Sequence, residues 1–212
     1  MIKIPNNNIA NNMKLPNGWK WVKLGDVCSQ DKNIIDASSG LGRSLPYLSL
    51  EHIESVSGEI LKDLIGQIDS EGISTTYTFD DSHVLYSKLR PYLNKVAMPD
   101  FAGRCTTELI PFLPDTAIIT KDYLAWIFRR EETVNVAMSG VTGSRMPRAN
   151  LKELGRMLIP LPPLPEQKRI VEKLNKQLEL AEKAKKAALE KLEAINKLRA
   201  SLLQKAFEGD GK

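Results

Sequence analysis

Cysteine and histidine are scarce in this chain, whose 212 residues include two of each. Cys28 and Cys105 are too few for a disulfide scaffold, so we expect two inert structural thiols. His52 and His83 have neither metal-ligand spacing nor a neighbouring cysteine pair, and we interpret each as a surface residue or a satisfied polar residue. The sequence therefore predicts neither a metal site nor a bound cofactor.

Long apolar runs are missing as well. No segment approaches the ~20 consecutive apolar residues that a membrane-spanning helix needs. The opening segment, MIKIPNNNIANNM, is rich in asparagine and has neither an apolar core nor a cleavage pattern, so it does not resemble a secretory signal. We expect residues 1–13 to form a flexible arm and the protein to be soluble and cytoplasmic, without membrane contact.

Catalytic motifs are also missing. The segment GLGRSL, which begins at Gly40, has two of the three glycines of a dinucleotide-binding loop, and no Walker loop is present. Asp100 and Glu108 resemble the carboxylate pair of a nuclease, but Ile110 stands where the lysine of such a site is expected. We therefore expect no catalytic residues, and the sequence is typical of a binding protein.

Positive charge is unevenly distributed along the chain. Residues 1–165 contain 18 Lys and Arg against 18 Asp and Glu, whereas residues 166–208 contain 11 against 7. The whole formal excess of +4 therefore belongs to the last part of the chain. Bulk charge does not argue that residues 1–165 bind nucleic acid, although basic residues cluster locally there.

The most informative segment is a long helical pattern. Between Glu166 and Glu208 there is no proline or glycine, and strong helix formers dominate. About 43 residues in a helix span ~64 Å. Apolar residues recur at alternating spacings of three and four, which indicates a heptad seam. The seam consists of Val171, Leu174, Leu178, Ala181, Ala188, Leu192, Ile195, Leu202 and Ala206, with Lys185 and Arg199 at the two interrupted positions.

This seam is too long for the preceding globule to cover, since ~150 residues form a domain only ~40 Å across. We therefore expect a second helix from another chain to pair with it. The alternative is a long helix that folds back on its own domain, or one that is broken into a hairpin. A second apolar row flanks the seam and suggests contact with more than one helix. That row consists of Ile170, Ala184, Leu189, Leu198 and Leu203.

The preceding residues have a mixed pattern, so the predicted fold class is α+β: a mixed domain followed by one long helix that forms a coiled coil. We expect strands in SLPYLSLEHI, in TTYTFDDSHVLYSKL on either side of Asp80 and Asp81, in KVAMPDF and in CTTELIPFLP. Residues 121–138 have the period of one helix. Asn150 is expected to cap a short helix, with Glu153 completing the cap.

In this order the segments resemble the specificity (S) subunit of type I restriction-modification systems. The resemblance extends from Leu15 to Glu208. Its motifs are LPNGWKWVKLGDV, LPYLSLEHI, VLYSKLRPYLNKVAMPDFAGRCTTELIPFLP and SGVTGSRMPRANLKELGRMLIPLPPLPEQKRIVEKL. The last motif is the most specific, because a loop, a short capped helix, a proline-rich strand end and a long helix follow one another.

The resemblance implies a protein without a catalytic site that reads double-stranded DNA. It implies a target recognition domain at residues 14–160, a spacer and dimerisation helix at residues 161–208, and a tail at residues 209–212. Such helices dock methyltransferase (M) subunits, and restriction/translocase (R) subunits join the full complex. The common subunit has two recognition domains and two spacer helices, whereas this chain resembles a half-length form with one of each.

A half-length form either pairs with itself or is a truncated gene product, and the exposed seam favours self-pairing. Two antiparallel copies of the helix would place identical recognition domains about a twofold axis, so the homodimer would read a palindromic, bipartite target. The alternative hypothesis is an interaction-only protein, such as a regulatory half-subunit, that binds partner subunits without reading DNA. Sequence-specific DNA binding by the assembled complex distinguishes the two.

Basic and hydroxyl side chains are the candidates for DNA contact. Arginine can bond guanine bidentately, and lysine can neutralise phosphate. The candidates are Arg43, Ser87, Lys88, Arg90, Thr142, Ser144, Arg145 and Arg148.

Overall fold

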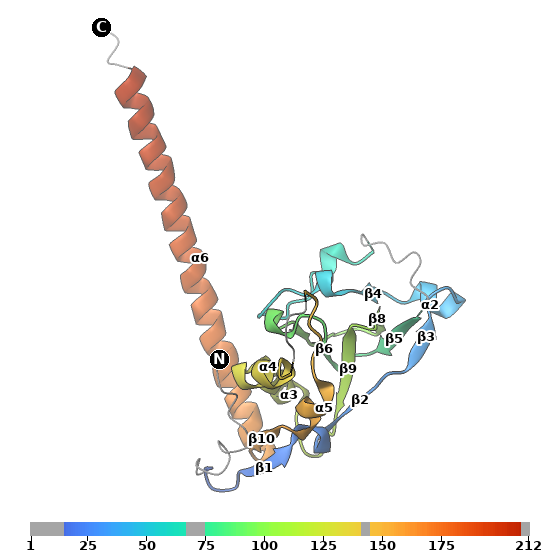
Figure 1. The fold of residues 1–212 in the computed structure, drawn as a ribbon. Coiled ribbons are helices and arrows are strands. Elements are labelled where there is room, and N and C mark those ends of the chain that lie inside the picture. The colour runs from blue at the N-terminus through green and yellow to red at the C-terminus, as the bar shows by residue number, and fades with distance from the viewer. Residues whose placement is uncertain (1–14, 67–74, 141–144, 209–212) are drawn as a thin grey trace. The chain divides into compact units, whose positions relative to one another are not determined.

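The computed structural model describes residues 15–66, 75–140 and 145–208. The chain divides into two compact units, residues 1–168 and residues 169–212. The first unit combines three small sheets with short helices, and the second is a helix (Figure 1). The expected α+β class is therefore confirmed. Within the described part of the chain, no helix combines the length and the apolar character that crossing a membrane requires.

Two four-stranded sheets form the centre of the first unit. One has the order β2 (Cys28–Gln30), β9 (Leu109–Pro114), β6 (Val84–Ser87) and β7 (Val96–Ala97), all antiparallel. The other has the order β3 (Ile34–Asp36), β5 (Thr75–Phe79), β8 (Gly103–Thr106) and β4 (Tyr47–Leu48), in which β4 and β8 are parallel. Buried apolar residues from both sheets, such as Leu48, Phe79 and Leu85, share one core.

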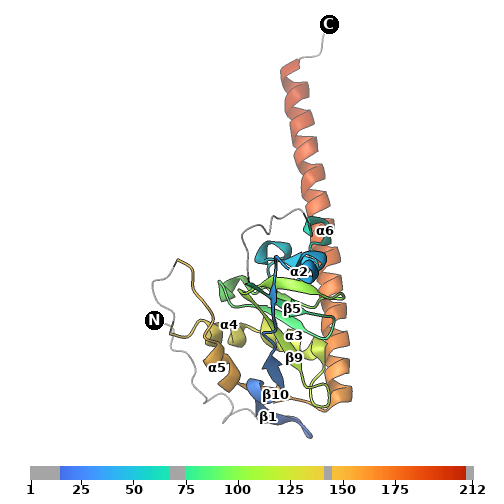
Figure 2. The same cartoon turned by 90° about the vertical axis from the view of Figure 1, so that its right-hand side faces the viewer.

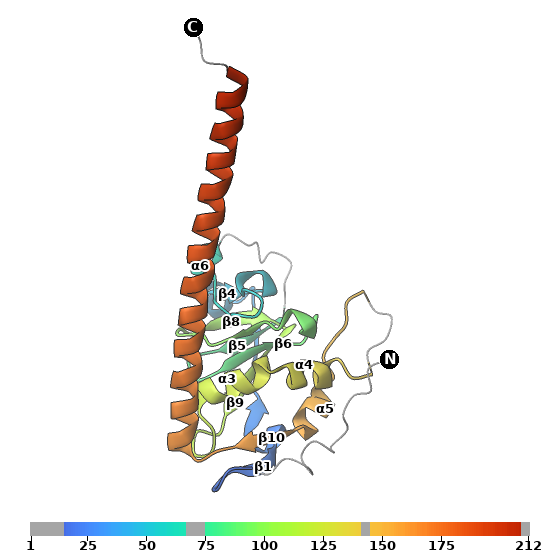
Figure 3. The same ribbon diagram turned by 90° about the vertical axis from the view of Figure 1, so that its left-hand side faces the viewer.

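A third, two-stranded sheet joins distant parts of the chain. β1 (Lys20–Lys23) pairs antiparallel with β10 (Leu158–Leu161), with Lys20 opposite Leu161. Figures 2 and 3 show these strands side by side at one end of the unit, close to the short helix α5 (Leu151–Arg156). The 3-10 turn η1 (Leu24–Asp26) follows β1 and packs against α5.

Both cysteines lie in this scaffold as free, buried thiols, as expected. Burial raises the pKa of Cys28 to about 12, and burial also raises the pKa of Cys105. Both histidines are buried and satisfied. His52 accepts a hydrogen bond from the backbone N–H of Ser49 and contacts the carbonyl oxygen of Leu64 at 3.2 Å.

Two predicted strands are shorter than expected. In SLPYLSLEHI only β4 is extended, because Ser49 caps a 3-10 turn, η2 (Leu50–His52), together with the ring of His52. CTTELIPFLP is not one strand, since a turn at Thr107 and Glu108 separates β8 from β9. The strands on either side of Asp80 and Asp81 are confirmed as β5 and β6, and KVAMPDF contains β7.

The single helix predicted for residues 121–138 is wrong. The structure has α3 (Lys121–Arg129) and α4 (Glu131–Ala137), with Arg130 between them in an extended conformation. The buried hydroxyl of Thr133 donates to the carbonyl oxygen of Ile127, so a side chain replaces a backbone donor at the break. On α3, Phe128 packs against Phe112 of β9, with ring centroids 4.7 Å apart.

The asparagine cap predicted for α5 is present, because the side chain of Asn150 accepts a hydrogen bond from the N–H of Glu153. The carboxylate of Glu153, which is predicted to complete the cap, forms an ion pair with Arg156 instead. The first unit also contains two further short 3-10 turns, η3 (Lys62–Leu64) and η4 (Pro91–Leu93).

The long helix α6 (Leu164–Glu208) begins two residues earlier than the predicted start at Glu166. Pro165 lies in its first turn, where the missing N–H has no intrahelical partner to lose. Residues 164–168 belong to the first unit. There the fully buried side chain of Gln167 accepts from the N–H of Thr120 at 2.8 Å and donates to the carbonyl oxygens of Ile118 and Pro162.

The second unit contains the rest of α6, and most of its apolar residues are exposed in the single chain. Leu192 and Ile195 of the seam are 54% and 61% exposed, whereas Val171 is buried. Lys185, which interrupts the seam, forms an ion pair with Glu182.

We predict that Gln167→Ala destabilises the first unit by about 2–4 kcal/mol, because it leaves one buried and two partly buried backbone groups without this partner. Urea denaturation followed by circular dichroism measures the free energy of unfolding. Lys168→Ala, at the exposed neighbouring position, is the matched control and should stay within ~0.5 kcal/mol of wild type. Equal stability of the two variants would contradict the role of the glutamine.

A second prediction concerns acid stability. Hydrogen bonds from Ser82, with a further contribution from His83, lower the pKa of Asp80 below its ordinary value of 3.8. A carboxyl whose pKa is lower in the folded chain than in the unfolded chain stabilises the fold at pH values above its unfolded-state pKa. This stabilisation is lost as the pH falls through the folded-state pKa. We expect Asp80→Asn to lower the free energy of unfolding at neutral pH by less than ~1 kcal/mol, because the carboxylate is largely exposed. In urea titrations, the difference in free energy of unfolding between wild type and Asp80→Asn should shrink below about pH 4. A difference that does not depend on pH would refute the stabilising role of the Asp80 carboxylate.

Candidate nucleic-acid interface

The segment that leaves β6 is held between two other parts of the chain. The N–H of Lys88 donates to the carbonyl oxygen of Glu108 at 2.9 Å, and its carbonyl accepts from the N–H of Ala149 at 2.6 Å. Between these bonds, Leu89 and Arg148 form an isolated antiparallel bridge. Residues 59 positions apart in the chain therefore lie side by side.

Arg90 extends this contact. Its N–H donates to the carbonyl oxygen of Pro147 at 2.7 Å, and its backbone is left-handed, with φ of 50°. A non-glycine residue in this conformation is uncommon and persists where its surroundings enforce it. The bond to Pro147 supplies that constraint, because the following Pro91, which begins η4, would by itself favour an extended backbone at Arg90. The side chain of Arg90 is exposed.

The segments 88–90 and 145–149 thus form one surface, which we refer to as the basic loop surface. Four of the candidates for DNA contact lie on it: Lys88, Arg90, Arg145 and Arg148. The backbone bonds between the two segments explain why these cations gather, although the sequence separates them. The surface belongs entirely to the first unit.

Glu108 is the acidic partner of this surface. Its carboxylate receives hydrogen bonds from Nη2 of Arg148 at 2.8 Å and from Nε at 3.2 Å, and it lies 3.8 Å from Nζ of Lys88. The hydrogen bond with Glu108, and then its charge, raise the pKa of Arg148. Two of the four cations are therefore partly neutralised, and the bond fixes the orientation of the Arg148 guanidinium.

The remaining candidates are placed elsewhere or differently. Ser87 is buried, and its hydroxyl donates to the carbonyl oxygen of Leu89, so it supports the surface from within. Arg43 is exposed on the short helix α2 (Gly40–Ser44), beside the other sheet. Lys95, a neighbouring cation that is not one of the candidates, donates to the carbonyl oxygen of Leu50, and burial lowers its pKa. Thr142 and Ser144 lie outside the described residues.

The two acids that resemble a nuclease pair have separate partners. Asp100 forms an ion pair with Lys62 at 2.7 Å, while Glu108 holds Arg148. Among the residues that the structure describes, no three His, Cys, Asp or Glu side chains are arranged to hold a metal ion.

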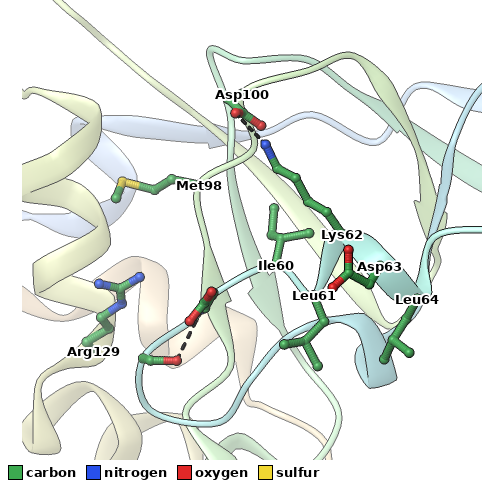
Figure 4. A pocket seen from close by; sticks show the side chains of 11 residues that line it. Ile60, Leu61, Lys62, Asp63, Leu64, Met98, Asp100 and Arg129 are labelled. Carbon is green, nitrogen blue, oxygen red and sulfur yellow. Dashed lines mark hydrogen bonds and ion pairs between the residues drawn. The ribbon is translucent and has the colours of Figure 1, made fainter. Parts of the chain in front are cut away.

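An open pocket of about 830 Å³ lies around the Lys62–Asp100 pair (Figure 4). Residues 57–64 line it together with Met98 and Arg129. Arg129 donates from Nη2 to the carbonyl oxygen of Val96, and burial lowers its pKa. This guanidinium thus holds the backbone of β7. Ser57 of the lining donates its hydroxyl to the carboxylate of Glu54.

Sequence reasoning identified the cations of the basic loop surface but missed Glu108 as their partner and the left-handed backbone at Arg90. The proline after Arg90 signals restricted backbone without specifying the left-handed region. Ion pairing between residues 40 positions apart leaves no signal in a single sequence.

Comparison with known proteins identifies the class to which this chain belongs. Residues 16–193 match the family described as the type I restriction modification DNA specificity domain. The chain therefore belongs to that family.

Individual relatives agree with this assignment. The chain is 30% identical over 205 residues to the type I restriction enzyme EcoDI specificity subunit of Escherichia coli, with 92% of this chain and 43% of that protein covered. It is 28% identical over 201 residues to the putative type I restriction enzyme MjaX specificity subunit of Methanocaldococcus jannaschii, with 84% and 46% covered. The chain thus spans less than half of the length of these relatives.

Solved structures show the same fold. The HsdS subunit from Thermoanaerobacter tengcongensis aligns with a TM-score of 0.67 at 26% identity, covering 91% of this chain and 49% of that one. A chain from a study of complex assembly and conformational transition of the type I R-M system aligns with a TM-score of 0.74 at 25% identity, covering 90% and 50%.

Proposed function

We propose that this chain is a non-catalytic subunit that reads a DNA sequence within a type I restriction-modification complex. The observation that carries the proposal is the basic loop surface, on which four cations gather in a member of a DNA specificity family. In this proposal residues 14–160 form the target recognition domain. Arg90 and Arg145 are the foremost candidates for contacting bases or phosphates, because both are exposed.

The charges of the basic loop surface support sequence-specific DNA binding rather than non-specific binding. Glu108 pairs with Lys88 and Arg148, while no described acidic side chain forms an ion pair with Arg90 or Arg145. Residues 1–165 carry equal numbers of acidic and basic residues. Non-specific binding depends on phosphate neutralisation, so a neutral domain gains little from it, and base contacts must provide the preference.

The exposed seam of α6 supports pairing of two copies. We propose that two helices pack antiparallel as a coiled coil and that the homodimer reads a palindromic, bipartite target whose gap follows from helix length. The second apolar row then docks methyltransferase subunits, and restriction/translocase subunits join the complex. Leu189, Leu198 and Leu203 of that row are exposed in the single chain, so both rows are accessible.

The electroneutrality of residues 1–165 also fits a second function, an interaction-only or regulatory subunit that binds partner subunits without reading DNA. The two functions differ in one measurable property. The first requires the complex to prefer one sequence over a scrambled one at physiological salt, and the second does not.

We predict that Arg90→Ala combined with Arg145→Ala weakens binding of the assembled complex to its cognate duplex by at least ~30-fold, because each lost arginine contact costs about 1–3 kcal/mol. Fluorescence anisotropy against cognate and scrambled duplexes measures both affinity and preference. Lys20→Ala with Lys23→Ala removes the same charge from β1 and is the matched control. Equal binding of cognate and scrambled DNA by the wild-type complex would favour the interaction-only function.

We predict that Leu192→Asp combined with Ile195→Asp converts the dimer to monomers, because charges would be buried in the seam. Light scattering at tens of micromolar protein measures the mass. Ala194→Asp with Lys197→Asp introduces two aspartates on the opposite helix face and should leave the dimer intact. A wild-type chain that is monomeric on its own at this concentration would overturn self-pairing.

A further inference from the structure

A short hairpin beside the basic loop surface presents a strained apolar residue. Ile53 and Ile60 form an antiparallel bridge, and the N–H of Glu54 donates to the carbonyl oxygen of Glu59 at 2.9 Å. Val56 lies at the tip with φ of 72° and is 68% exposed. A β-branched residue in the left-handed region is a genuine outlier, and exposure of its side chain gives no burial to offset the strain.

The surroundings of the hairpin enforce this conformation. The N–H of Val56 donates to the carbonyl oxygen of Asn94 at 3.2 Å, and Asn94 is itself left-handed with φ of 49°. Two residues later the hairpin passes so close to β7 that a Cβ on Gly58 would lie 1.8 Å from the carbonyl oxygen of Val96. The tip is therefore fixed against the 90–94 turn.

That turn shares Arg90 with the basic loop surface. The N–H of Leu93 donates to the carbonyl oxygen of Arg90, and Arg90 bonds to Pro147. Backbone hydrogen bonds thus join three loops, residues 54–58, 90–94 and 145–149, into one continuous frame.

Apolar side chains are concentrated on this frame. Among the described residues of the first unit, six large apolar side chains are exposed, and three of them lie on the three loops. These three are Val56, Tyr92 and Met146, which are 68%, 52% and 50% exposed. Exposed Arg90 and Arg145 stand on the same loops. Apolar groups that share loops with cations fit the major groove, where thymine methyl groups lie between the phosphate backbones, better than they fit an apolar protein surface.

We propose that Val56 determines specificity by contacting the 5-methyl group of a thymine in the target. This inference rests on the proposed function, because it requires that the first unit reads DNA. The fixed tip holds the valine methyl groups rigidly, so the contact loses little conformational entropy on binding. Val56 then reads a base pair that the arginines do not read.

The test begins with the complete chain in the complex that it forms. A randomised duplex library is selected at physiological salt and sequenced, which gives the target. Each thymine of that target is then replaced by deoxyuridine, which lacks only the 5-methyl group. We expect one such replacement to weaken wild-type binding about 5-fold or more, as a lost base contact does. For the Val56→Ala complex the same replacement should have no effect, because the methyl contact is already absent.

Two further variants separate recognition from structure. Val56→Gly accepts the left-handed backbone and removes the same methyl groups, so it should lose the same thymine preference without losing thermal stability. Ile34→Ala truncates an equally exposed β-branched side chain outside the three loops, and its thymine dependence should match wild type.

The outcomes are distinct. If the wild-type complex selects a sequence and both Val56 variants keep its full dependence on thymine methyl groups, this inference is overturned and the proposed function stands. If the wild-type complex selects no sequence, the proposed function itself fails, and the inference fails with it. A methyl dependence that both Val56 variants lose and Ile34→Ala keeps would support it.

Discussion

The buried amide of Gln167 is the interaction on which the first unit depends. From the first turn of α6, it forms hydrogen bonds with the residues that precede α3 and with the proline-rich segment after β10. Nearby, Nε1 of Trp19 donates to the carboxylate of Glu166 at 2.8 Å, which ties the start of the described chain to the same turn. An amide can donate and accept at once, so one side chain satisfies groups that no regular sheet or helix would pair. The antiparallel pairing of β1 with β10 also joins the start of the described chain to the segment that precedes α6.

On the basic loop surface, which we propose to contact DNA, an acidic side chain offsets part of the positive charge. Glu108 orients Arg148 and limits the net positive charge, so attraction to phosphate is restrained while the donor geometry is retained. The arginines Arg90 and Arg145 remain exposed on the same loops. In our proposal, such a surface has a lower affinity for DNA of any sequence and a greater preference for one sequence.

Much of the architecture could be predicted from local pattern. The period of α6 and the asparagine cap of α5 depend on neighbouring residues, which a single sequence displays. The break at Arg130 could not be predicted, because buried Thr133 supplies the replacement hydrogen bond and no proline or glycine marks the site. For the candidate site, the basic residues were recognisable by type. Their assembly depends on the bridge between Leu89 and Arg148, and the inward position of Ser87 depends on its burial, which are tertiary properties.

The three loops beside the two sheets are joined by main-chain atoms. The bonds from Val56 to Asn94, from Arg90 to Pro147 and from Ala149 to Lys88 use only main-chain groups. Every residue provides the carbonyl, and every residue except proline provides the N–H. Apart from Gly58, where a Cβ would collide with the carbonyl oxygen of Val96, side chains on these loops can therefore be exchanged during evolution while the frame persists. Such a frame permits divergence in ligand preference without a new fold, and it favours these positions for engineering altered preference.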